Sequence, residues 1–317
     1  MPESVPLDRD ALAGPGYQQL RWDDHLARHV AAQAVGWLAE DLGHECDWTS
    51  VGLVEASARS ELAVVSRRAG VVAGLPAAAI VAAATDPSLA FEPRIADGTA
   101  VAPGDTLATL AGPTRSVLAA ERTVLNLLGR LSGIATATRR LVDAVAETPC
   151  RVYDTRKTVP GWRLLDKYAT RAGGGWNHRL GLYDAILIKD NHLAALAAAG
   201  IEPAAAVRRA RAFLGQTFPP SRAEAMVVEI EIDSIGQLEP VLAAAPDIVL
   251  LDNMQPDELA GCVALRDRLA PRVVLEASGG IRPETVAATA RAGVNRVSTG
   301  WPTHDAPWLD IALDWNS

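Results

Sequence analysis

The sequence predicts an α/β fold whose C-terminal part is an incomplete or compact parallel barrel. After Thr148, short runs rich in β-branched residues alternate with helical patterns, the order expected when helices connect parallel strands. These runs lack regular polar alternation, as expected for strands covered on both faces. A complete eight-stranded barrel takes about 250 residues. This segment is far shorter, so we expect a barrel that is not complete.

The expected strands and helices of this part follow one another regularly. The strands are Arg151–Asp154, Ala185–Lys189, Met226–Ile232, Asp247–Asp252, Arg272–Ala277 and Asn295–Thr299. The helical patterns cover about residues 162–172, 193–214, 234–244, 256–269 and 283–292. Every strand ends in polar or glycine-rich sequence. Parallel α/β sheets bind ligands at the carboxyl ends of their strands, so we expect the functional site there.

The first part of the chain predicts a mixture of helices and strands. Residues 1–20 are rich in Pro, Gly and Asp and are expected to form a loose arm. Apolar residues recur at helical spacing from Trp22 to about Leu42, which predicts an amphipathic helix. Val64 to Ala84 is expected to contain one or two strands that lead into a buried, alanine-rich helix.

The sequence of residues 91–112 predicts short strands joined by turns. The turns are indicated by Asp97-Gly98 and by Pro103-Gly104-Asp105. The pattern is similar to the sandwich of biotinyl and lipoyl carrier domains, but the segment has no lysine to carry the prosthetic group. We therefore exclude a carrier function and interpret the segment as structural.

A long helical pattern covers Glu121 to Glu147. Gly129 and Ser132-Gly133 are expected to split it into two helices. Three polar residues at a spacing of four are expected to share one face: Arg122, Asn126 and Arg130.

Composition indicates an ordinary soluble globular protein. The chain has 317 residues, is 49% hydrophobic and carries a net charge of -8, which argues against nucleic-acid binding. Its three cysteines form no CxxC pair, which favours reduced thiols over disulfides or a zinc site. The N-terminus lacks a signal-peptide pattern, and the apolar run at 70–85 is too short to span a bilayer. We expect a cytoplasmic protein with no membrane partner.

The stretch from Asp154 to His192 is marked by its lysines. It contains all three lysines of the chain, whereas arginine carries the positive charge elsewhere. Because a lysine ammonium and a planar guanidinium are not interchangeable, we interpret Lys157 and Lys189 as functional and Lys167 as structural. They belong to a cationic cluster suited to small anions with carboxylates or phosphates: Arg156, Lys157, His178, Arg179 and Lys189.

A second group of charges is acidic. Glu229 and Glu231 are two residues apart on one expected strand and so face the same side, and Asp252 ends the next strand. Carboxylates of this kind suit Mg2+, which usually takes one or two of them plus substrate phosphate oxygens. A structural salt-bridge role for the two glutamates is the alternative.

Two glycine turns are expected to bind phosphate. Ser278-Gly279-Gly280 precedes a helix expected to start near Pro283, and Gly300 follows the final strand. The strand ends together predict a site for a polycarboxylate beside a phosphorylated sugar, with magnesium. We interpret His25, His29 and His44 as ordinary helix or loop histidines and leave His304 undecided.

The chain resembles the quinolinate phosphoribosyltransferase family over nearly its whole length. The motifs are ERTVLNLLGRLSGIAT, DTRKTVPGWRLLDKYATRAGGGWNHRLGLYDAILIKDNH, VEIEID, LLDNM, LEASGGI and STG followed by TH. The resemblance implies an N-terminal α/β sandwich domain, to which the C-terminus returns, plus an incomplete parallel α/β barrel. The implied parts are a flexible arm at 1–20, the sandwich at 21–128 with 302–317, and the barrel at 129–301.

The resemblance also implies an activity and the residues that perform it. The family transfers phosphoribose from 5-phosphoribosyl 1-pyrophosphate to quinolinate with Mg2+, giving nicotinate mononucleotide, pyrophosphate and CO2 in de novo NAD biosynthesis. Lys157, Lys189, Glu231 and Asp252 would be catalytic, the last two at the magnesium. Arg122 would complete the site of a neighbouring subunit, so a homodimer would be the smallest competent unit. The implied substrate-binding residues are Arg122, Thr155, Arg156, Lys157, His178, Arg179, Lys189, Glu231, Asp252, Ser278, Gly279, Gly280, Thr299 and Gly300.

Two stretches depart from the family pattern. Trp301-Pro302 stands where the family has a small residue followed by leucine, and the indole is expected to alter the phosphate pocket or a subunit contact. Gln216–Ala225 is expected to be an extended loop.

Three other functions stay open from the sequence. One is a paralogue of the same fold that acts on a different aromatic acid, such as the pyrophosphorylase-like proteins associated with molybdenum transport. Another is an aldolase that forms a Schiff base through Lys189. The third is a non-catalytic protein that binds a phosphosugar.

Overall fold

The computed structural model describes residues 16–315 and divides into two compact units. Unit 1 takes the described residues 16–19, 140–159 and 175–304, and unit 2 takes 20–139, 160–174 and 305–315. No helix within residues 16–315 is long and apolar enough to cross a bilayer. Most of the expected arm, residues 1–15, lies outside the described residues.

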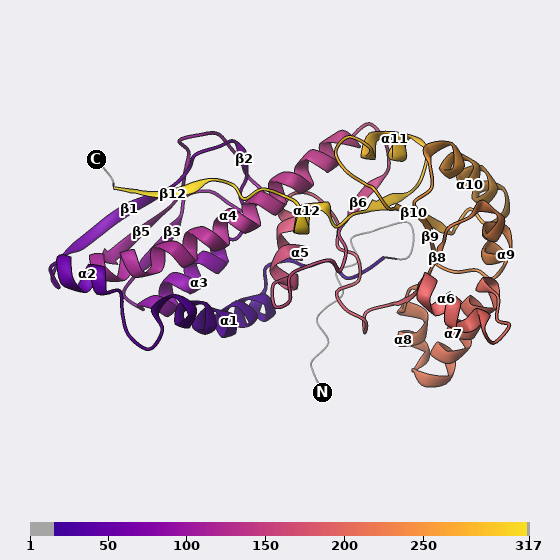
Figure 1. The fold of residues 1–317 in the computed structure, drawn as a ribbon, viewed down its shortest axis with the longest axis horizontal. Helices are drawn as coiled ribbons and strands as arrows, with labels where there is room; N and C mark the ends of the chain where they lie inside the picture. The colour runs from indigo at the N-terminus through magenta and orange to yellow at the C-terminus, as the bar shows by residue number, and fades with distance from the viewer. Residues whose placement is uncertain (1–15, 316–317) are drawn as a thin grey trace. The chain divides into compact units, whose positions relative to one another are not determined.

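Unit 1 is built on a parallel sheet of six strands in the order β6-β11-β10-β9-β8-β7 (Figure 1). All six strands expected from the sequence are confirmed: β6 (Arg151–Tyr153), β7 (Ile186–Ile188), β8 (Val228–Ile232), β9 (Ile248–Asp252), β10 (Val274–Ser278) and β11 (Arg296–Ser298). Every pairing is parallel, and within the described chain no ladder joins the end strands β6 and β7. The expected incomplete barrel is therefore confirmed.

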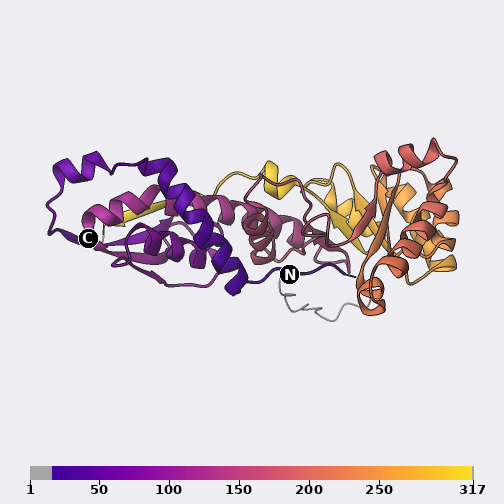
Figure 2. The ribbon, with the colours of Figure 1, turned by 90° about the horizontal axis from the view of Figure 1, so that it is seen from below.

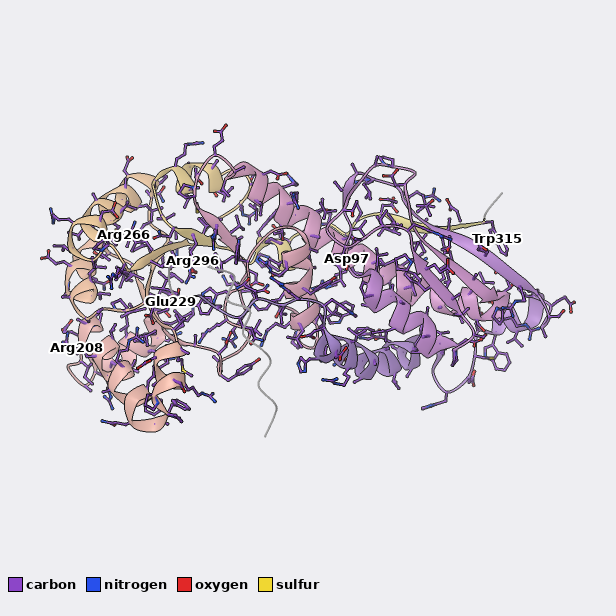
Figure 3. All side chains as sticks on the ribbon, turned by 180° about the vertical axis from the view of Figure 1, so that it is seen from behind. Asp97, Arg208, Glu229, Arg266, Arg296 and Trp315 are labelled. Carbon is purple, nitrogen blue, oxygen red and sulfur yellow. The ribbon has the colours of Figure 1, made fainter. Side chains whose placement is uncertain are left out.

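Helices cover the outer side of this curved sheet (Figures 1 and 2). They are α6 (Asp190–Ala197), α7 (Pro203–Thr217), α8 (Pro220–Ala225), the 3-10 helix η1 (Ile235–Gln237), α9 (Leu238–Ala243), α10 (Pro256–Leu269) and α11 (Val286–Arg291). The short helix α12 (Trp301–His304) instead follows the carboxyl end of β11. Val228 and Ile230 of β8 belong to the same buried core as Val207 of α7 and Val241 of α9. Glu229, between them in sequence, points into the barrel, as Figure 3 shows. The outer face of the sheet is thus apolar core, and the inner face carries charge.

Unit 2 combines an antiparallel sheet of order β12-β1-β5-β3 with helices. The C-terminal strand pairs with β1 from Leu62↔Trp315 to Ser66↔Ile311, so the expected return of the C-terminus is confirmed. The strands are β1 (Arg59–Ser66), β3 (Ala90–Pro93), β5 (Thr106–Pro113) and β12 (Ile311–Trp315), with a separate pair β2 (Gly70–Val71) and β4 (Ala100–Val101). The helices are α1 (Asp24–Leu42), α2 (Trp48–Leu53), α3 (Leu75–Thr85), α4 (Thr114–Ala144, of which residues 114–139 lie in this unit) and α5 (Arg163–Ala172).

The units do not divide where the expected boundary at 128/129 lies. The division falls inside α4, between residues 139 and 140, and α5 belongs to unit 2. Helix α5 belongs to unit 2 because its apolar residues Leu165, Tyr168 and Ala169 are buried in the hydrophobic core of that unit.

The expected break of the helix at Gly129 and Ser132-Gly133 is wrong, since α4 is continuous. A Cβ on Gly133 would lie 2.9 Å from Trp308 Cα and would also overlap the carbonyl oxygen of Pro307. Leu309 N–H donates to Gly129 O at 2.9 Å. The two glycines therefore let the C-terminal segment lie against the helix backbone and do not end the helix.

Two expectations about the region before β8 are also wrong. The single helix expected at 193–214 is two helices, because Gly200, with a φ of 69°, and Pro203 separate α6 from α7. The expected loop at Gln216–Ala225 contains the end of α7 and the short helix α8. Pro220 occupies the first position of α8, where proline favours helix initiation.

Alanine at Gly133 is expected to destabilise the protein. Overpacking against a backbone costs about 1–3 kcal/mol, which exceeds the gain of about 1 kcal/mol from replacing a helical glycine by alanine. Gly36 of α1 is the matched control, because it is exposed and a Cβ there meets nothing within 4 Å. Urea unfolding of Gly133→Ala should show a loss and Gly36→Ala a gain. A gain in both would contradict the close approach.

Candidate active site

A buried aspartate fixes the loop that follows Trp176 against the end of β6. Asp154 Oδ1 accepts the backbone N–H of His178 at 2.8 Å, and Asp154 Oδ2 accepts from Asn177 Nδ2 at 2.8 Å. The backbone N–H of Asp154 in turn donates to Trp176 O at 2.9 Å. These bonds bring His178 and Arg179 to the strand that precedes Arg156, so two distant parts of the expected cationic cluster meet.

The guanidinium groups of Arg156 and Arg179 lie near each other. Arg179 is buried and donates through Nη1 to Ala185 O at 3.2 Å. Burial and the charge of Arg156 lower the pKa of Arg179 below its ordinary value. Arg156 Nε is buried and has no hydrogen-bond partner among the described residues. Because unsatisfied buried donors are costly, this arrangement is typical of a site that receives an anion.

His178 joins the cationic cluster to the acidic one. Its Nε2 lies 3.2 Å from Glu229 Oε2 and 3.5 Å from Glu276 Oε1. Its Nδ1 accepts the backbone N–H of Arg179 at 2.8 Å. Burial alone would lower the pKa of His178, but the carboxylates of Glu229 and Glu276 outweigh it and raise the pKa to about 9. The two carboxylates therefore favour the cationic imidazole, whereas the Arg179 N–H at Nδ1 favours the neutral tautomer with its proton on Nε2.

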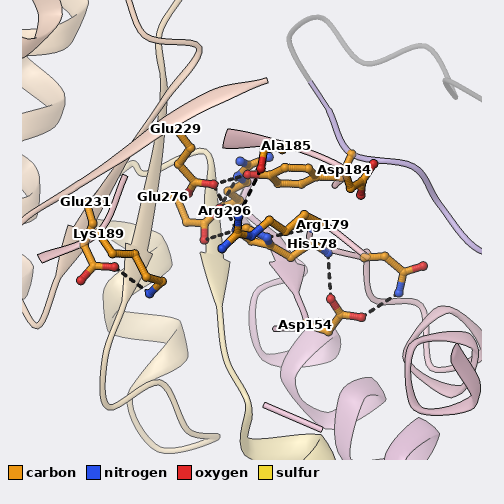
Figure 4. A network of polar contacts seen from close by, with 12 residues as sticks. Asp154, His178, Arg179, Asp184, Ala185, Lys189, Glu229, Glu231, Glu276 and Arg296 are labelled. Carbon is orange, nitrogen blue, oxygen red and sulfur yellow. Dashed lines mark hydrogen bonds and ion pairs between the residues drawn. The ribbon is translucent and has the colours of Figure 1, made fainter. Parts of the chain in front are cut away.

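The carboxylates below His178 form a buried ionic network inside the barrel (Figure 4). Arg296 Nε of β11 lies 2.5 Å from Glu276 Oε2 of β10. Burial favours the neutral form of Glu276, but Arg296 and His178 overcome this and lower its pKa to about 2. The donor atoms of His178, Glu229 and Glu276 lie within 4.8 Å of one another, as metal ligands would. The His178 imidazole and the Arg296 guanidinium already pair with these carboxylates, so this geometry is a network of ionic contacts.

Lys189 and Glu231 form an ion pair at the carboxyl ends of β7 and β8. Lys189 Nζ donates to Glu231 Oε2 at 2.9 Å, and the lysine side chain is half-exposed. The pairing of Lys189 Nζ with a carboxylate argues against imine chemistry at Lys189. Glu231 thus pairs with Lys189 and Glu229 with His178, so both glutamates form the ion pairs that the structural alternative expects.

Asp252 ends β9, the strand next to β8 in the sheet. Glu231 is aligned with Leu250 in the ladder between β8 and β9. Asp252 is two residues after Leu250, so its side chain lies on the same face of the sheet as Glu231 and nearer to the carboxyl edge. Asp252 Oδ2 accepts from Asn253 Nδ2 at 2.7 Å and is half-buried. This oxygen donor set fits a hard divalent cation.

The glycine turn after β10 requires its glycines. Gly279 has a φ of 93°, and a Cβ there would overlap the side chain of Asn253 and lie 2.9 Å from Asn253 N. Gly280 has a φ of 61° and open space around the position of a Cβ. The helix expected near Pro283 begins only at Val286, because a turn held by the Thr285 hydroxyl, which donates to Gly280 O at 2.8 Å, precedes it. Any anion here would thus bind the turn itself.

The second turn, at Gly300, lies beside Lys157. A Cβ on Gly300 would meet Lys157 Cβ at 3.2 Å and His304 Nε2 at 3.1 Å. Thr303 Oγ1 donates to Lys157 O at 2.7 Å. The undecided His304 therefore belongs to this corner of the sheet edge, next to an expected catalytic lysine.

Threonines link these turns to the strands. Thr299 Oγ1 donates to Ile281 O at 2.8 Å, which ties the end of β11 to the segment after Gly280. Thr155 Oγ1 accepts the backbone N–H of Lys157 at 3.0 Å. Both hydroxyls thus shape the backbone of the site.

The indole of Trp301 packs into the core of unit 1, with the Arg140 guanidinium 5.7 Å from its ring centroid. This position explains how the chain accommodates a bulky residue directly after the Gly300 turn.

Arg122 is exposed on α4, in unit 2. Arg130, eight residues further along the helix, has a structural role, because its Nε donates to Asp166 Oδ1 at 3.1 Å and its Nη2 donates to Asp166 Oδ2 at 2.8 Å. Lys167 is fully buried in α5, in line with its structural interpretation.

Sequence reasoning missed Glu276, Arg296 and Tyr17. Glu276 lies two residues before Ser278, so the period of two that placed Glu229 and Glu231 on one face would also have placed Glu276 inside the barrel. Arg296 precedes Ser298 by the same interval. Tyr17 lies in a segment without periodicity, and nothing in its sequence context marked it.

The raised pKa of His178 predicts a pH dependence of stability. An unfolded histidine titrates near about 6.5, so between pH 6.5 and 9 the folded protein keeps a proton that the unfolded chain has lost. The stabilisation is full below pH 6.5 and is lost as pH rises through 9, by up to about 3 kcal/mol. Among the described residues, the charged and titratable groups around the imidazole include Tyr17, Asp154, Arg179, Glu229, Glu276 and Arg296.

Urea unfolding at several pH values checks this dependence. The unfolding free energy of the unaltered protein should fall more steeply between pH 6.5 and 9 than that of His178→Gln. Parallel curves for the two proteins would show that His178 does not hold the extra proton.

A parallel α/β sheet whose carboxyl edge carries paired guanidiniums, a lysine–carboxylate pair and two glycine turns defines an enzyme for small anionic substrates. Models of the quinolinate phosphoribosyl transferase N-terminal and C-terminal domains match residues 47–132 and 134–314. The chain belongs to the quinolinate phosphoribosyltransferase family.

Relatives of this chain share most of its length. It is 40% identical over 277 residues to a probable nicotinate-nucleotide pyrophosphorylase (carboxylating) of Synechocystis, covering 87% of this chain and 89% of that protein. It is 41% identical over 282 residues to the nicotinate-nucleotide pyrophosphorylase (carboxylating) of Mycobacterium leprae, covering 87% and 94%. The solved nicotinate-nucleotide pyrophosphorylase from Francisella tularensis has a TM-score of 0.84 at 33% identity, covering 95% of this chain and 100% of that one. Proteins with these names are pentosyltransferases.

Proposed function

We propose that the protein transfers phosphoribose from 5-phosphoribosyl 1-pyrophosphate to the ring nitrogen of quinolinate. The products are nicotinate mononucleotide, pyrophosphate and CO2, in de novo NAD biosynthesis. The observation that carries this proposal is the pair of neighbouring guanidiniums, Arg156 and Arg179, with a buried donor that has no hydrogen-bond partner within residues 16–315. Together with His178 and Lys189, they supply enough positive charge for the two carboxylates of quinolinate.

The residues at the strand ends act by orientation and electrostatics. As pyrophosphate departs, positive charge develops on the ribose C1, and the carboxylates of Glu231 and Asp252 stabilise it. Lys157 and Lys189 neutralise negative charge on the leaving group and on the dicarboxylate. The Gly279–Gly280 and Gly300 turns hold the 5-phosphate through backbone N–H groups. No covalent nucleophile is required.

Decarboxylation then follows from the charge of the product. Once the ring nitrogen carries ribose it is cationic, so the carbanion left at C2 when the 2-carboxylate departs as CO2 is stabilised. A proton from water then adds to C2. Arg156 and Arg179 hold the dicarboxylate in place during this step.

Magnesium is the proposed cofactor. Glu231 and Asp252, from neighbouring strands, would hold the ion together with substrate oxygens, in keeping with their oxygen donor set. When bound, the ion supplies charge neutralisation for the pyrophosphate.

A homodimer is the proposed smallest active unit, with Arg122 of one subunit completing the site of its partner. Arg122 is exposed on α4 and available for such a role. If so, Arg122→Ala and Lys189→Ala subunits, each inactive alone, should regain about one quarter of full activity when mixed and re-equilibrated, because half of the dimers have one intact site. No recovery, with mixed dimers present, would contradict the sharing of sites.

Product analysis tests the activity. The purified protein is incubated with quinolinate, phosphoribosyl pyrophosphate and Mg2+, and nicotinate mononucleotide and pyrophosphate are measured, with a parallel sample in chelator. Equal amounts of both products, abolished by chelator, are expected. Absence of nicotinate mononucleotide with the metal present would contradict the proposal.

A further inference from the structure

A short segment before α1 lies inside unit 1. Tyr17 and Gln19 fall within the expected loose arm but are only 6% and 7% exposed. Tyr17 is buried with Ala185, Val227 and Ile248, residues at or just before the first residues of β7, β8 and β9. The segment therefore approaches the sheet from the amino ends of the strands, opposite the edge that carries Lys189, Glu231 and Asp252.

Tyr17 contacts the ionic network beneath the site. Its ring stacks on the His178 imidazole, with ring centroids 4.3 Å apart and an interplanar angle of 25°. Its hydroxyl donates a hydrogen bond to Glu229 Oε2, the same oxygen that faces His178. The Arg296 guanidinium lies 5.1 Å from the centroid of the Tyr17 ring. One side chain thus touches three members of the network.

Gln19 forms hydrogen bonds with the backbone of Asn177, the residue before His178. Its amide donates to Asn177 O at 2.9 Å and accepts the Asn177 N–H at 2.7 Å, so it satisfies both backbone groups of that residue. The same amide nitrogen donates to Tyr17 O at 2.9 Å. Gln19 therefore connects the backbone of Tyr17 to the loop that carries His178.

This combination restricts a side chain that its own loop does not hold rigidly. His178 and Arg179 lie outside any helix or strand. Asp154 and Gln19 fix the backbone at His178 and Asn177, the tyrosine ring covers one face of the imidazole, and Glu229 binds both the tyrosine hydroxyl and the imidazole. Because the Arg179 N–H donates to His178 Nδ1, a rotation of the imidazole would also disturb Arg179.

We propose that Tyr17 is a positioning residue for quinolinate binding, acting through the orientation of His178. The role rests on the proposed function, because His178 and Arg179 are the residues that receive the dicarboxylate. Tyr17 itself lies on the far side of the imidazole and binds no substrate. The segment before α1 thus contributes to the active site through Tyr17, and the hydrogen bonds of Gln19 fix the position of this segment against the loop that carries His178.

Variants at position 17 separate the stack from the hydroxyl. Tyr17→Leu removes the stacked ring, whereas Tyr17→Phe keeps the ring and removes the hydrogen bond to Glu229. Misplacement of a binding group by about 1 Å can cost about a hundredfold. We expect Tyr17→Leu to raise the KM for quinolinate about tenfold or more and to leave the KM for phosphoribosyl pyrophosphate within about twofold. Tyr17→Phe should recover most of the loss, and Gln19→Ala should repeat it in weaker form.

The matched control is Phe213→Leu. Phe213 is an aromatic residue of α7 in the same unit, in edge contact with Phe218 and half-exposed. It has no part in the site, so both KM values should stay unchanged. Thermal unfolding of every variant shows whether kinetic changes merely follow loss of folded protein.

An activity-independent measurement keeps the proposal testable if the proposed reaction fails. The protein, labelled with 13C at histidine Cε1, has six histidines, and His178→Gln assigns the signal of His178. The stacked ring should shift that signal by its ring current. The shift should persist in Tyr17→Phe and disappear in Tyr17→Leu.

The outcomes are distinct. A selective rise of the quinolinate KM in Tyr17→Leu, with recovery in Tyr17→Phe and loss of the ring-current shift, supports the proposal. An unchanged quinolinate KM, equal rises for both substrates, or a Tyr17→Phe variant as impaired as Tyr17→Leu would overturn it, as would an unchanged His178 signal. If the unaltered protein shows no turnover but the ring-current shift is present, the proposed function is refuted, whereas the stacking of Tyr17 on His178 is supported.

Discussion

Arg179→Ala is expected to raise the KM for quinolinate about a hundredfold and the KM for phosphoribosyl pyrophosphate less than about threefold. Arg179 is buried and lies near Arg156, whose buried Nε has no hydrogen-bond partner among the described residues. Each hydrogen bond to a charged group contributes about 1.5–3 kcal/mol, and a carboxylate left unpaired in a buried site costs more. Steady-state kinetics with each substrate varied in turn measures both constants.

Two arginine controls sharpen this test. Arg179→Lys keeps the charge but loses the planar fork, so the KM for quinolinate should lie between those of the unaltered protein and the alanine variant. Arg208→Ala removes an exposed arginine on the outer helix α7, which Figure 3 shows away from Glu229 and Arg296, and should change neither constant. Equal rises in both KM values for Arg179→Ala would refute the assignment of Arg179 to the dicarboxylate.

Arg296→Leu is expected to lower the free energy of unfolding by about 3–5 kcal/mol. It leaves the fully buried Glu276 without its guanidinium partner, and breaking a buried ion pair on one side has a cost of this size. The loss is a large part of the 5–15 kcal/mol that stabilises a typical domain. Urea unfolding followed by circular dichroism, together with the yield of soluble protein, measures it.

A partly exposed ion pair in the same unit provides the control. Arg211 Nη2 and Asp247 Oδ2 are 2.5 Å apart, but their side chains are 33% and 25% exposed. Arg211→Leu should therefore cost about 1 kcal/mol or less. The double variant Arg296→Leu with Glu276→Leu should recover much of the loss, because no buried charge remains unpaired at that pair. A cost for Arg296→Leu no larger than for Arg211→Leu would contradict the buried network.

The strands of the barrel could be predicted because their signal is local. Runs such as Val228–Ile232 and Ile248–Asp252 contain the β-branched residues of a covered strand, and their polar ends mark the carboxyl edge. The sheet order also follows from right-handed strand–helix–strand connections, which bring successive strand ends together. The expected site residues at those ends therefore needed no tertiary information.

The continuity of α4 could not be predicted in this way. Gly129 and Gly133 carry the local signal of a helix break, but their absent side chains make room for residues 307–309, which are about 175 positions away in sequence. A glycine that permits close approach and a glycine that ends a helix look the same in sequence.

The buried residues of the site could not be predicted from the sequence for a related reason. Glu276 and Arg296 occur within apolar strands, where only their mutual pairing makes them tolerable, and that pairing is a tertiary fact. The expected division into a cationic and an acidic cluster also separated His178 from its carboxylate partners. Tyr17 lies about 160 residues from His178, and no local pattern connects the two.

The most direct test of the account is the stoichiometry of decarboxylation. The purified protein is given phosphoribosyl pyrophosphate and Mg2+ with quinolinate carrying 13C in its 2-carboxylate, and in a parallel sample with nicotinate. We predict one labelled CO2 for each nicotinate mononucleotide formed from quinolinate, and no product from nicotinate. Product from nicotinate alone would contradict the assignment of Arg156, Arg179 and their neighbours to two carboxylates.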